Sequence, residues 1–354
     1  MKALVLSGGA GTRLRPLSHS MPKQLVPVAN KPVLEHVLEN VRDAGVTEIG
    51  VIVGAWADQI GEVLSDGSRL GVRLTYLRQD RPRGLADCVR LARPFLGDDD
   101  FVMYLGDVML PDGVARYADQ FRRHRPAAQV LVHKVDDPRA FGIVELDPDG
   151  TVRRLVEKPR QPRGDLALVG VYFFTPAIHA GVDAITPSAR GELEITDAVQ
   201  WLVTSGAEVR ASEYDGYWRD TGQVADLLAC NRHLLDSQPR AVAAGSVDGA
   251  SELTGAVVVE PGARIVASRV EGPVVIGAGA VVEGCRIGPH TAIGPGCRLV
   301  DAEVADSIVL ADASITAVRG LRGCLIGRSA TVSLSPAAGS RLVVGDHSRI
   351  EFAA

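Results

Sequence analysis

The chain has 354 residues and a formal net charge of −5, and 46% of its residues are hydrophobic. This length suggests two domains, and this apolar fraction is enough to bury a core. Basic and acidic residues are mixed along the chain without a block of lysine and arginine, which argues against a nucleic-acid or membrane-surface role.

Up to about residue 236, short apolar runs alternate with helical patterns. Six runs are predicted to be strands: 2–6, 48–53, 73–77, 101–107, 129–135 and 168–174. Between the first two, residues 33–45 have helical spacing and end in Gly45, a helix stop signal. This alternation predicts an α/β fold with a Rossmann-like, mainly parallel sheet, and ligands of such sheets bind beyond the carboxyl ends of the strands.

From about residue 248 the pattern changes to one aliphatic residue followed by small and turn residues. The steps from Ile276 to Val282, from Ile287 to Ile293 and from Ile293 to Leu299 are each six residues, while the step from Val282 to Ile287 is five. A hexapeptide repeat of this kind predicts a left-handed parallel β-helix. We therefore predict a first domain over residues 1–236, a linker over 237–247 and a β-helix domain over 248–354.

The five cysteines stand singly, and none forms a CxxC pair. We interpret them as small buried residues in a reducing compartment, and not as metal ligands or disulfides. The amino-terminus shows no signal-peptide pattern, and no apolar run approaches the roughly 18 residues of a membrane span. The chain is therefore expected to be soluble and cytoplasmic.

The stretch SGGAGTRLRP after the first predicted strand has the composition of a phosphate-binding loop. A dinucleotide fingerprint starting at Gly9 would need glycine where Leu14 stands, and a Walker A loop starting at Gly8 would need glycine where Arg13 stands. NAD binding and P-loop ATP hydrolysis are thus not expected. The loop still offers backbone amides to an anion, and Arg13, Arg15 and Lys23 add positive charge.

The order of several motifs resembles that of the sugar-1-phosphate nucleotidyltransferases, over residues 1–236. The carrying stretches are GGAGTRLRP, PKQLVPV, RPRGLADCV, LGD, FGIVELD, VEKP, SARGELEITD and YWRDTG. Within that family they are similar to the glucose-1-phosphate thymidylyltransferases, and the appended β-helix resembles the long form, often found in deoxysugar and antibiotic pathways. The resemblance implies transfer of a nucleotidyl group from dTTP to glucose 1-phosphate, with pyrophosphate released.

Both reactants of such a transfer are anions, and the attacking phosphate oxygen is already ionised. Catalysis then depends on neutralising charge and on aligning the groups in line, with basic residues and a metal. The resemblance implies that Arg13 stabilises the leaving pyrophosphate, that Lys23 bridges phosphates, and that Arg15 assists at the triphosphate. It implies a Mg²⁺ ion held by Asp107 and Asp220, because two carboxylates together with phosphate oxygens suit this ion.

The resemblance also implies the substrate-binding residues. The catalytic set is Arg13, Lys23, Asp107 and Lys158. The nucleotide site comprises Leu6, Gly8, Gly9, Gly11, Thr12, Arg13, Gln24, Gln79, Gly84, Leu85 and Asp107, with the glutamine amides facing the base. The sugar-phosphate site comprises Gly142, Glu157, Lys158, Val169, Gly170, Tyr172, Arg190 and Trp218.

One position departs from the family pattern, because Val108 stands where thymidylyltransferases usually carry asparagine. The loss of an amide near the sugar leaves a modified sugar or a cyclitol phosphate as an alternative substrate, and Gln79 alone does not exclude UTP or another nucleotide. His290 in the β-helix leaves open a bifunctional acyltransferase, and a non-catalytic regulator is a further alternative. We expect the β-helix to serve packing into a homo-oligomer, and no nucleic-acid or membrane partner.

Overall fold

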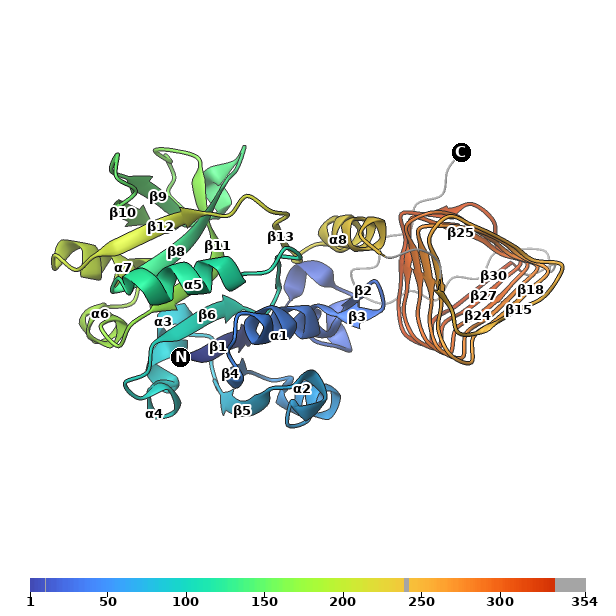
Figure 1. Ribbon diagram of the computed structural model, residues 1–354, viewed down its shortest axis with the longest axis horizontal. Helices are drawn as coiled ribbons and strands as arrows, with labels where there is room; N and C mark the ends of the chain where they lie inside the picture. Colours follow the sequence, from blue (N-terminus) through green and yellow to red (C-terminus); the bar gives the residue numbers. More distant parts are fainter. Residues whose placement is uncertain (10, 239–241, 335–354) are drawn as a thin grey trace. The chain divides into compact units, whose positions relative to one another are not determined.

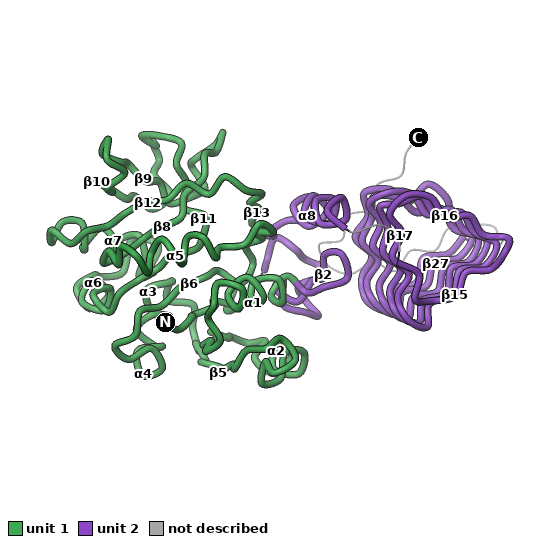
Figure 2. The backbone as a smooth tube through the Cα atoms, in the orientation of Figure 1, with its two compact units in different colours: residues 1–10, 33–220 green, residues 11–32, 221–354 purple. Residues whose placement is uncertain are grey.

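A computed structural model describes residues 1–9, 11–238 and 242–334 (Figure 1). The chain divides into two compact units, Met1–Ala10 with Val33–Asp220 and Gly11–Pro32 with Thr221–Ala354 (Figure 2). Most of the predicted phosphate-binding segment therefore folds with the second unit. The predicted linker includes residues 239–241 and the predicted second domain includes 335–354, and both of these stretches lie outside the described residues.

A nine-stranded mixed sheet forms the centre of the first unit, in the order β10-β9-β11-β6-β1-β4-β5, with β8 joining β11 to β12. β4, β5 and β6 run parallel with β1 in register, whereas β11 is antiparallel to β6 and β8. The strands are β1 (Lys2–Ser7), β4 (Glu48–Val53), β5 (Arg73–Arg78), β6 (Phe101–Leu105), β8 (Ala128–Lys134), β9 (Ile143–Leu146), β10 (Val152–Val156), β11 (Leu166–Phe174) and β12 (Val209–Glu213). A two-stranded ribbon, β7 (Val108–Met109) with β13 (Arg219–Asp220), accompanies them.

Seven α-helices among the described residues of the first unit connect these strands. They are α1 (Val33–Asp43), α2 (Ala57–Leu64), α3 (Leu85–Leu91), α4 (Arg93–Leu96), α5 (Ala115–His124), α6 (Ile178–Ala184) and α7 (Ile195–Thr204). The six predicted strands and the predicted helix are confirmed, and Gly45 follows α1 with a φ of 78°. No helix among the described residues is long and apolar enough to cross a membrane.

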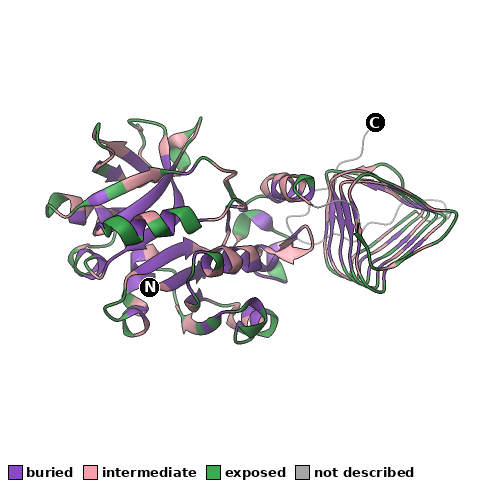
Figure 3. Ribbon diagram, viewed as in Figure 1, coloured by how far each residue is buried: buried purple, intermediate pink, exposed green. Residues whose placement is uncertain are grey.

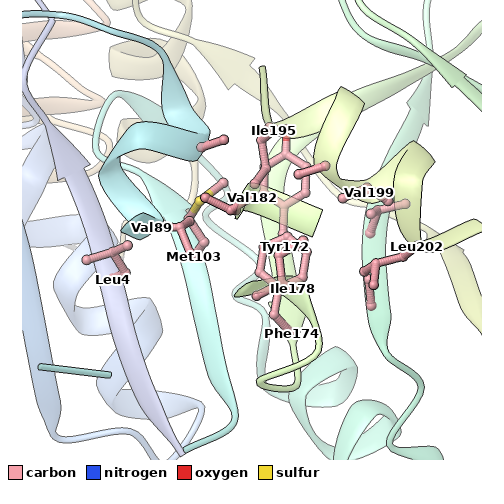
Figure 4. Packing of buried hydrophobic residues seen from close by; sticks show 14 of the residues in the cluster. Leu4, Val89, Met103, Tyr172, Phe174, Ile178, Val182, Ile195, Val199 and Leu202 are labelled. Carbon is pink, nitrogen blue, oxygen red and sulfur yellow. The ribbon is translucent and has the colours of Figure 1, made fainter. Parts of the chain in front are cut away.

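The core of the first unit lies between the sheet and its helices. Phe101 and Met103 on β6 share one cluster with Tyr172 and Phe174 on β11 and with apolar residues of α3, α6 and α7 (Figure 4). On the opposite face, the Tyr104 hydroxyl accepts a hydrogen bond from the side chain of Asn40 on α1 at 3.2 Å. The central strands are accordingly buried along most of their length (Figure 3). Such a sheet holds the loops at its strand ends in fixed positions.

Four of the five cysteines are buried as expected, and all five are free thiols. Cys88, Cys230, Cys285 and Cys297 are buried free thiols, and Cys324 is half-buried. Burial raises the pKa of the Cys88 thiol to about 12. This confirms their interpretation as small apolar residues.

The second unit contains a β-helix with three sides, each a parallel sheet, as predicted. The sides are β14-β17-β20-β23-β26-β29, β15-β18-β21-β24-β27-β30 and β16-β19-β22-β25-β28. The strands are β14 (Val242–Ala243), β15 (Ser246–Val247), β16 (Glu252–Thr254), β17 (Val257–Val259), β18 (Arg264–Val266), β19 (Arg269–Glu271), β20 (Val274–Ile276), β21 (Val281–Glu283), β22 (Arg286–Ile287), β23 (Thr291–Ile293), β24 (Arg298–Val300), β25 (Glu303–Ala305), β26 (Ile308–Val309), β27 (Ser314–Thr316), β28 (Leu321–Arg322), β29 (Leu325–Ile326) and β30 (Thr331–Ser333).

The pairing register explains the five-residue step in the repeat. Ile265 pairs with Val282, and Val282 pairs with Leu299, so one coil advances 17 residues instead of the 18 of three full hexapeptides. One corner of each such coil is therefore a residue shorter, at the position of the step from Val282 to Ile287. Both of these side chains are fully buried in the interior of the prism.

Besides the β-helix, the described residues of the second unit include the segment 11–32 and one helix. The segment makes three short helical turns, Thr12–Leu14, Leu17–His19 and Lys23–Leu25, and then a hairpin of β2 (Pro27–Val28) and β3 (Lys31–Pro32). Both residues at the tip of the hairpin, Ala29 and Asn30, have positive φ, as a two-residue type I′ turn requires. The helix is α8 (Val224–Asp236).

Candidate functional site

The glycine loop begins where β1 ends, at the carboxyl edge of the parallel strands. Gly8 follows Ser7, and Gly54 follows β4. A Cβ added to Gly54 would lie 3.2 Å from the backbone oxygen of Gly8. A Cβ on Gly8 itself would lie 3.7 Å from the Oε1 atom of Gln79, which follows β5. The ends of three neighbouring strands thus bring together the loop and one predicted base-binding glutamine.

Gln79 is held by a residue that the sequence did not single out. Its Nε2 donates to the Oδ2 of Asp87 at 3.0 Å, and its backbone N–H donates to Val53. A carboxylate only accepts hydrogen bonds, so Asp87 fixes which end of the amide is the donor and leaves Oε1 toward the loop. Asp87 is buried and also accepts from Arg90 at 2.5 Å. An aspartate near the start of a helix is common, so the sequence gives no sign that Asp87 contacts Gln79.

Gly84 and Leu85 lie at the start of α3, close to Leu193. Gly84 has a φ of 101°, and a Cβ there would overlap the backbone of Leu193. The Leu193 N–H donates to Arg83 at 2.7 Å, and the Ala86 N–H donates to Leu193 at 3.0 Å. Glycine at position 84 is therefore required by both its dihedral angle and its surroundings.

The predicted metal ligands come from segments far apart in the sequence. Asp107 follows β6, and Asp220 ends β13, whose register pairs it with Val108 on β7. The two aspartates therefore stand on adjacent backbone segments, one position out of register, and one carboxylate oxygen of Asp220 is buried. Among the described residues no group of three or more His, Cys, Asp and Glu could hold a metal by itself. Two carboxylates fit a magnesium ion whose other ligands are phosphate oxygens and water.

The predicted sugar-phosphate residues gather around Glu157, which directly follows β10. The Nζ of Lys158 lies 3.5 Å and the Nη2 of Arg190 lies 3.4 Å from the Oε1 of Glu157. Its Oε2 accepts from the hydroxyl of Thr196 at 3.3 Å. A Cβ on Gly142 would lie only 3.2 Å from the same oxygen, so glycine leaves the carboxylate open on that side.

The charges of this cluster are set by burial and by a second carboxylate. Burial raises the pKa of Glu157 above its ordinary value of 4.5, and Lys158 opposes that effect. Arg190 is fixed by Glu194, with Nη2 to Oε2 at 2.8 Å and Nε to Oε1 at 3.1 Å. Burial would lower the pKa of Arg190, but the carboxylates of Glu194, Glu157 and Glu192 together outweigh burial, and the pKa is raised. Glu194 and Thr196 both lie within the SARGELEITD motif, and this motif was the sequence signal for both of them.

Three further predicted sugar residues lie on β11 and one beside it. The indole N–H of Trp218 donates to the carbonyl of Val169 at 3.1 Å. Gly170 has a φ of 92°, and a Cβ there would lie 3.2 Å from a methyl group of Val108. Tyr172 is buried in the core beside Phe174 (Figure 4), and burial, then the Glu157 charge, raises the pKa of its hydroxyl. Val108 is itself buried, so its methyl groups pack against the backbone of β11.

The remaining predicted residues belong to the second unit, on the segment 11–32. Thr12 and Arg13 are exposed, and Lys23 is half-buried. Gly11 has a φ of 62°, its carbonyl accepts from the Ser18 hydroxyl at 2.7 Å, and a Cβ there would lie 3.3 Å from the Cβ of Lys23. These contacts bring Gly11 and Lys23 together within the segment.

Gln24, the other predicted base-binding glutamine, is buried. Its Oε1 has no hydrogen-bond partner among the described residues. A buried amide oxygen in this state can accept from a ligand donor.

His290, the alternative acyl-transfer residue, packs against α8. Its Nε2 lies 2.8 Å from the Oδ1 of Asp236, and its carbonyl accepts from the side chain of Asn231. His290 also has a φ of 60°, which places it at a corner of the β-helix. These contacts fit a packing role.

Comparisons with known proteins agree with the motifs. A family model described as nucleotidyl transferase matches residues 2–237. The chain is 52% identical to a glucose-1-phosphate thymidylyltransferase of Streptomyces griseus, over 99% of both chains. It is 42% identical to a low-salt glycan biosynthesis nucleotidyltransferase of Haloferax volcanii, over 99% of this chain and 100% of the other. A solved Bacillus anthracis structure, assigned as a glucose-1-phosphate thymidylyltransferase, is 32% identical with a TM-score of 0.63, over 68% of this chain and 96% of the other.

Proposed function

The chain belongs to the nucleotidyl transferase family, and from this premise we propose that it joins dTTP and glucose 1-phosphate into dTDP-glucose and pyrophosphate. The observation that carries the proposal is the 52% identity to a thymidylyltransferase over 99% of both chains, β-helix included. The residues around Gln79 and around Glu157 fit a base and a sugar phosphate, respectively.

We propose that a phosphate oxygen of glucose 1-phosphate attacks the α-phosphorus of dTTP. The new P–O bond forms as the bond from the α-phosphorus to the bridging oxygen breaks, and the electron pair leaves with pyrophosphate. No proton has to be removed from the nucleophile. Arg13 and Lys23 neutralise the triphosphate and the departing pyrophosphate, and Arg15 assists there. Positioning of this kind can supply roughly 7–11 kcal/mol of the barrier.

The sugar phosphate is held by the Glu157 cluster. The Glu157 carboxylate accepts hydrogen bonds from sugar hydroxyls, and Lys158 and Arg190 bind the phosphate. Gly142, Val169, Gly170, Tyr172 and Trp218 form the surroundings of the ring. The Nη2 of Arg190 already lies within 3.4 Å of Glu157, so one side chain links the hydroxyl-binding and phosphate-binding functions.

The base is held by Gln79, with Gln24, Gly84 and Leu85. Because Asp87 accepts a hydrogen bond from the Nε2 of Gln79, the Oε1 of Gln79 can accept a hydrogen bond from the N3–H of thymine. Uracil carries the same N–H, whereas cytosine and adenine have an acceptor nitrogen in its place, so Gln79 separates dTTP and UTP from CTP and ATP more than it separates dTTP from UTP. Leu6, Gly8, Gly9, Gly11 and Thr12 complete the nucleotide site.

Asp107 and Asp220 would hold a Mg²⁺ ion, which, when bound, screens the negative charge of the phosphates. Residues 1–236 are proposed as the catalytic domain and residues 237–247 as a linker, whose strands β14 and β15 already pair with the β-helix. The β-helix is proposed as the surface of a homo-oligomer in the cytoplasm. The metal assignment is supported by the pairing of β7 with β13, and the other assignments are supported by the family pattern.

Product analysis tests the proposed reaction. The full chain is incubated with dTTP, glucose 1-phosphate and Mg²⁺, and products are separated by ion-exchange chromatography and weighed by mass spectrometry. We expect dTDP-glucose and pyrophosphate in equal amounts, and neither product when glucose 1-phosphate is left out. Pyrophosphate release without the sugar phosphate would contradict the proposal.

A further inference from the structure

The hairpin that ends the segment 11–32 is seated on the β-helix. The side chain of Asn30 donates through Nδ2 to the carbonyl of Ile293 on β23 at 2.8 Å. Ala29, at the same tip, shares an apolar cluster with Leu235 of α8 and with Val275 and Ala292 of the β-helix. A side chain and an apolar contact therefore tie the two turn residues to the same flank of the β-helix.

Asn231 on α8 also connects the tip of the hairpin to the β-helix. Its Oδ1 accepts from the Ala29 N–H at 2.9 Å, and its Nδ2 donates to the carbonyl of His290 at 2.9 Å. Asn231 is fully buried. One side chain therefore bridges the hairpin and the β-helix, and all its named partners are backbone groups.

The hairpin is continuous with the residues assigned to the triphosphate. Between Lys23 and the tip lie Leu25, Val26 and Val28, which are all buried and fix the path of the chain. The Gly11 carbonyl is bonded to Ser18, and the chain around Lys23 packs against Gly11. Between β29 and β30 of the β-helix, Arg328 donates to the carbonyl of Ser20 at 3.1 Å. The β-helix thus holds the segment at Ser20 as well as at its tip.

We propose that the β-helix positions the triphosphate-binding segment, with Asn30 and Asn231 as positioning residues for the transfer reaction. The inference rests on the proposed function, since it needs Arg13 and Lys23 to bind the triphosphate. Packing into an oligomer would not require backbone groups of the segment 11–32 to be bonded to the β-helix and α8. The predicted effect is specific, because the residues assigned to the sugar phosphate belong to the first unit.

Two substitutions at Asn30 test the proposal in the full chain. Asn30→Gly keeps the positive φ of 65° and deletes the side chain, and Asn30→Asp keeps the shape and removes the N–H donor. For both we expect the KM for dTTP to rise and kcat to fall, so that kcat/KM for dTTP falls about tenfold. This loss is smaller than the roughly 100-fold that a 1 Å misplacement can cost. The KM for glucose 1-phosphate should change less than about twofold, a split that general destabilisation would not produce.

Asp306→Asn is the matched control. Asp306 forms an ion pair with Arg232 of α8, at 2.5 and 2.7 Å, and has a φ of 50° that asparagine tolerates. This variant removes an ion pair between α8 and the β-helix but keeps both hydrogen bonds of Asn231 and every bond to the segment 11–32, so its dTTP kinetics should stay those of the unsubstituted chain. Unchanged dTTP kinetics in both Asn30 variants, or an equal change in Asp306→Asn, would overturn the inference. If the unsubstituted chain prefers another triphosphate, the proposed function fails, and the same comparison made with that triphosphate still decides the inference.

Discussion

The Nε2 of Gln79 lies 3.0 Å from the Oδ2 of Asp87, and this bond sets the orientation of the amide that faces the glycine loop. Asp87 is buried and cannot donate when ionised, so the amide oxygen of Gln79 is presented as an acceptor. In the proposed nucleotide site, this carboxylate on a short helix would thereby decide which base edge the Gln79 amide can bind.

Replacing this carboxylate should weaken nucleotide binding. Asp87→Asn allows the Gln79 amide to turn over, because the new side chain offers both a donor and an acceptor. A hydrogen bond to a charged group is worth about 1.5–3 kcal/mol, so we expect kcat/KM for dTTP to fall roughly 10- to 100-fold. Steady-state kinetics with dTTP and glucose 1-phosphate measure it. Arg90→Gln is the control, since it removes the ion-pair partner of Asp87 at 2.5 Å and leaves Gln79 in place.

Arg190→Lys should affect the other substrate. Glu194 binds the planar guanidinium through both of its oxygens, an arrangement that an ammonium group does not reproduce. The KM for glucose 1-phosphate should rise roughly 10- to 100-fold, on the scale of a lost charge-assisted hydrogen bond, while the KM for dTTP stays constant. Arg153→Lys, at a more exposed arginine of β10 bonded to Glu145, serves as the control. Equal kinetics in the two variants would remove Arg190 from the sugar-phosphate site.

The raised pKa of Glu157 predicts a pH effect on sugar binding. Burial holds the pKa above 4.5, so the carboxylate becomes protonated at a higher pH than an ordinary glutamate as the pH falls. A protonated carboxyl accepts fewer hydrogen bonds from sugar hydroxyls, so the KM for glucose 1-phosphate should rise as the pH falls toward that pKa. The Glu157→Gln side chain cannot titrate. At each pH, the KM of the unsubstituted chain is therefore divided by the KM of this variant, and the ratio cancels the effect of ionisation of the substrate itself. A flat ratio down to pH 4.5 would show that Glu157 does not bind the sugar in its ionised form.

Asp107→Asn should abolish turnover and leave dTTP binding within a few-fold. The amide keeps the shape of the side chain but removes one of the two carboxylates assigned to magnesium. Pyrophosphate release measures turnover, and calorimetry with dTTP and Mg²⁺ measures binding. Asp119→Asn, at an exposed residue paired only on the surface with Arg122, should leave both quantities unchanged. Near-normal turnover in Asp107→Asn would refute the metal assignment.

The sequence predicted the strands around the glycine loop because their apolar runs are long and end at clear turn signals. It did not predict the direction of β11, since an apolar run has the same pattern in either direction. The pairing of Asp220 with Val108 depends on strands of two residues, which are too short to show a period. The family motifs alone suggested that these segments meet.

Other parts of the site depend on tertiary contacts that leave no local signal. Asp87 and Glu194 are charged residues beside or within helices, a pattern that usually indicates a solvated surface. The outward-facing Val275 and Ala292 were part of the hexapeptide pattern, but only the structure shows that Leu235 and Ala29 cover them. The five-residue step was visible in the sequence, and the 17-residue register explains it as a short corner.

The measurement that tests the proposed function most directly is kcat/KM for pyrophosphate release, determined for dTTP, UTP, ATP, CTP and GTP against several sugar 1-phosphates. We predict a clear maximum for dTTP with glucose 1-phosphate, with UTP next because uracil shares the N3–H that Gln79 accepts. Such a result would make Val108 compatible with glucose. A maximum at a purine triphosphate, or at a modified sugar or cyclitol phosphate in place of glucose 1-phosphate, would contradict the account.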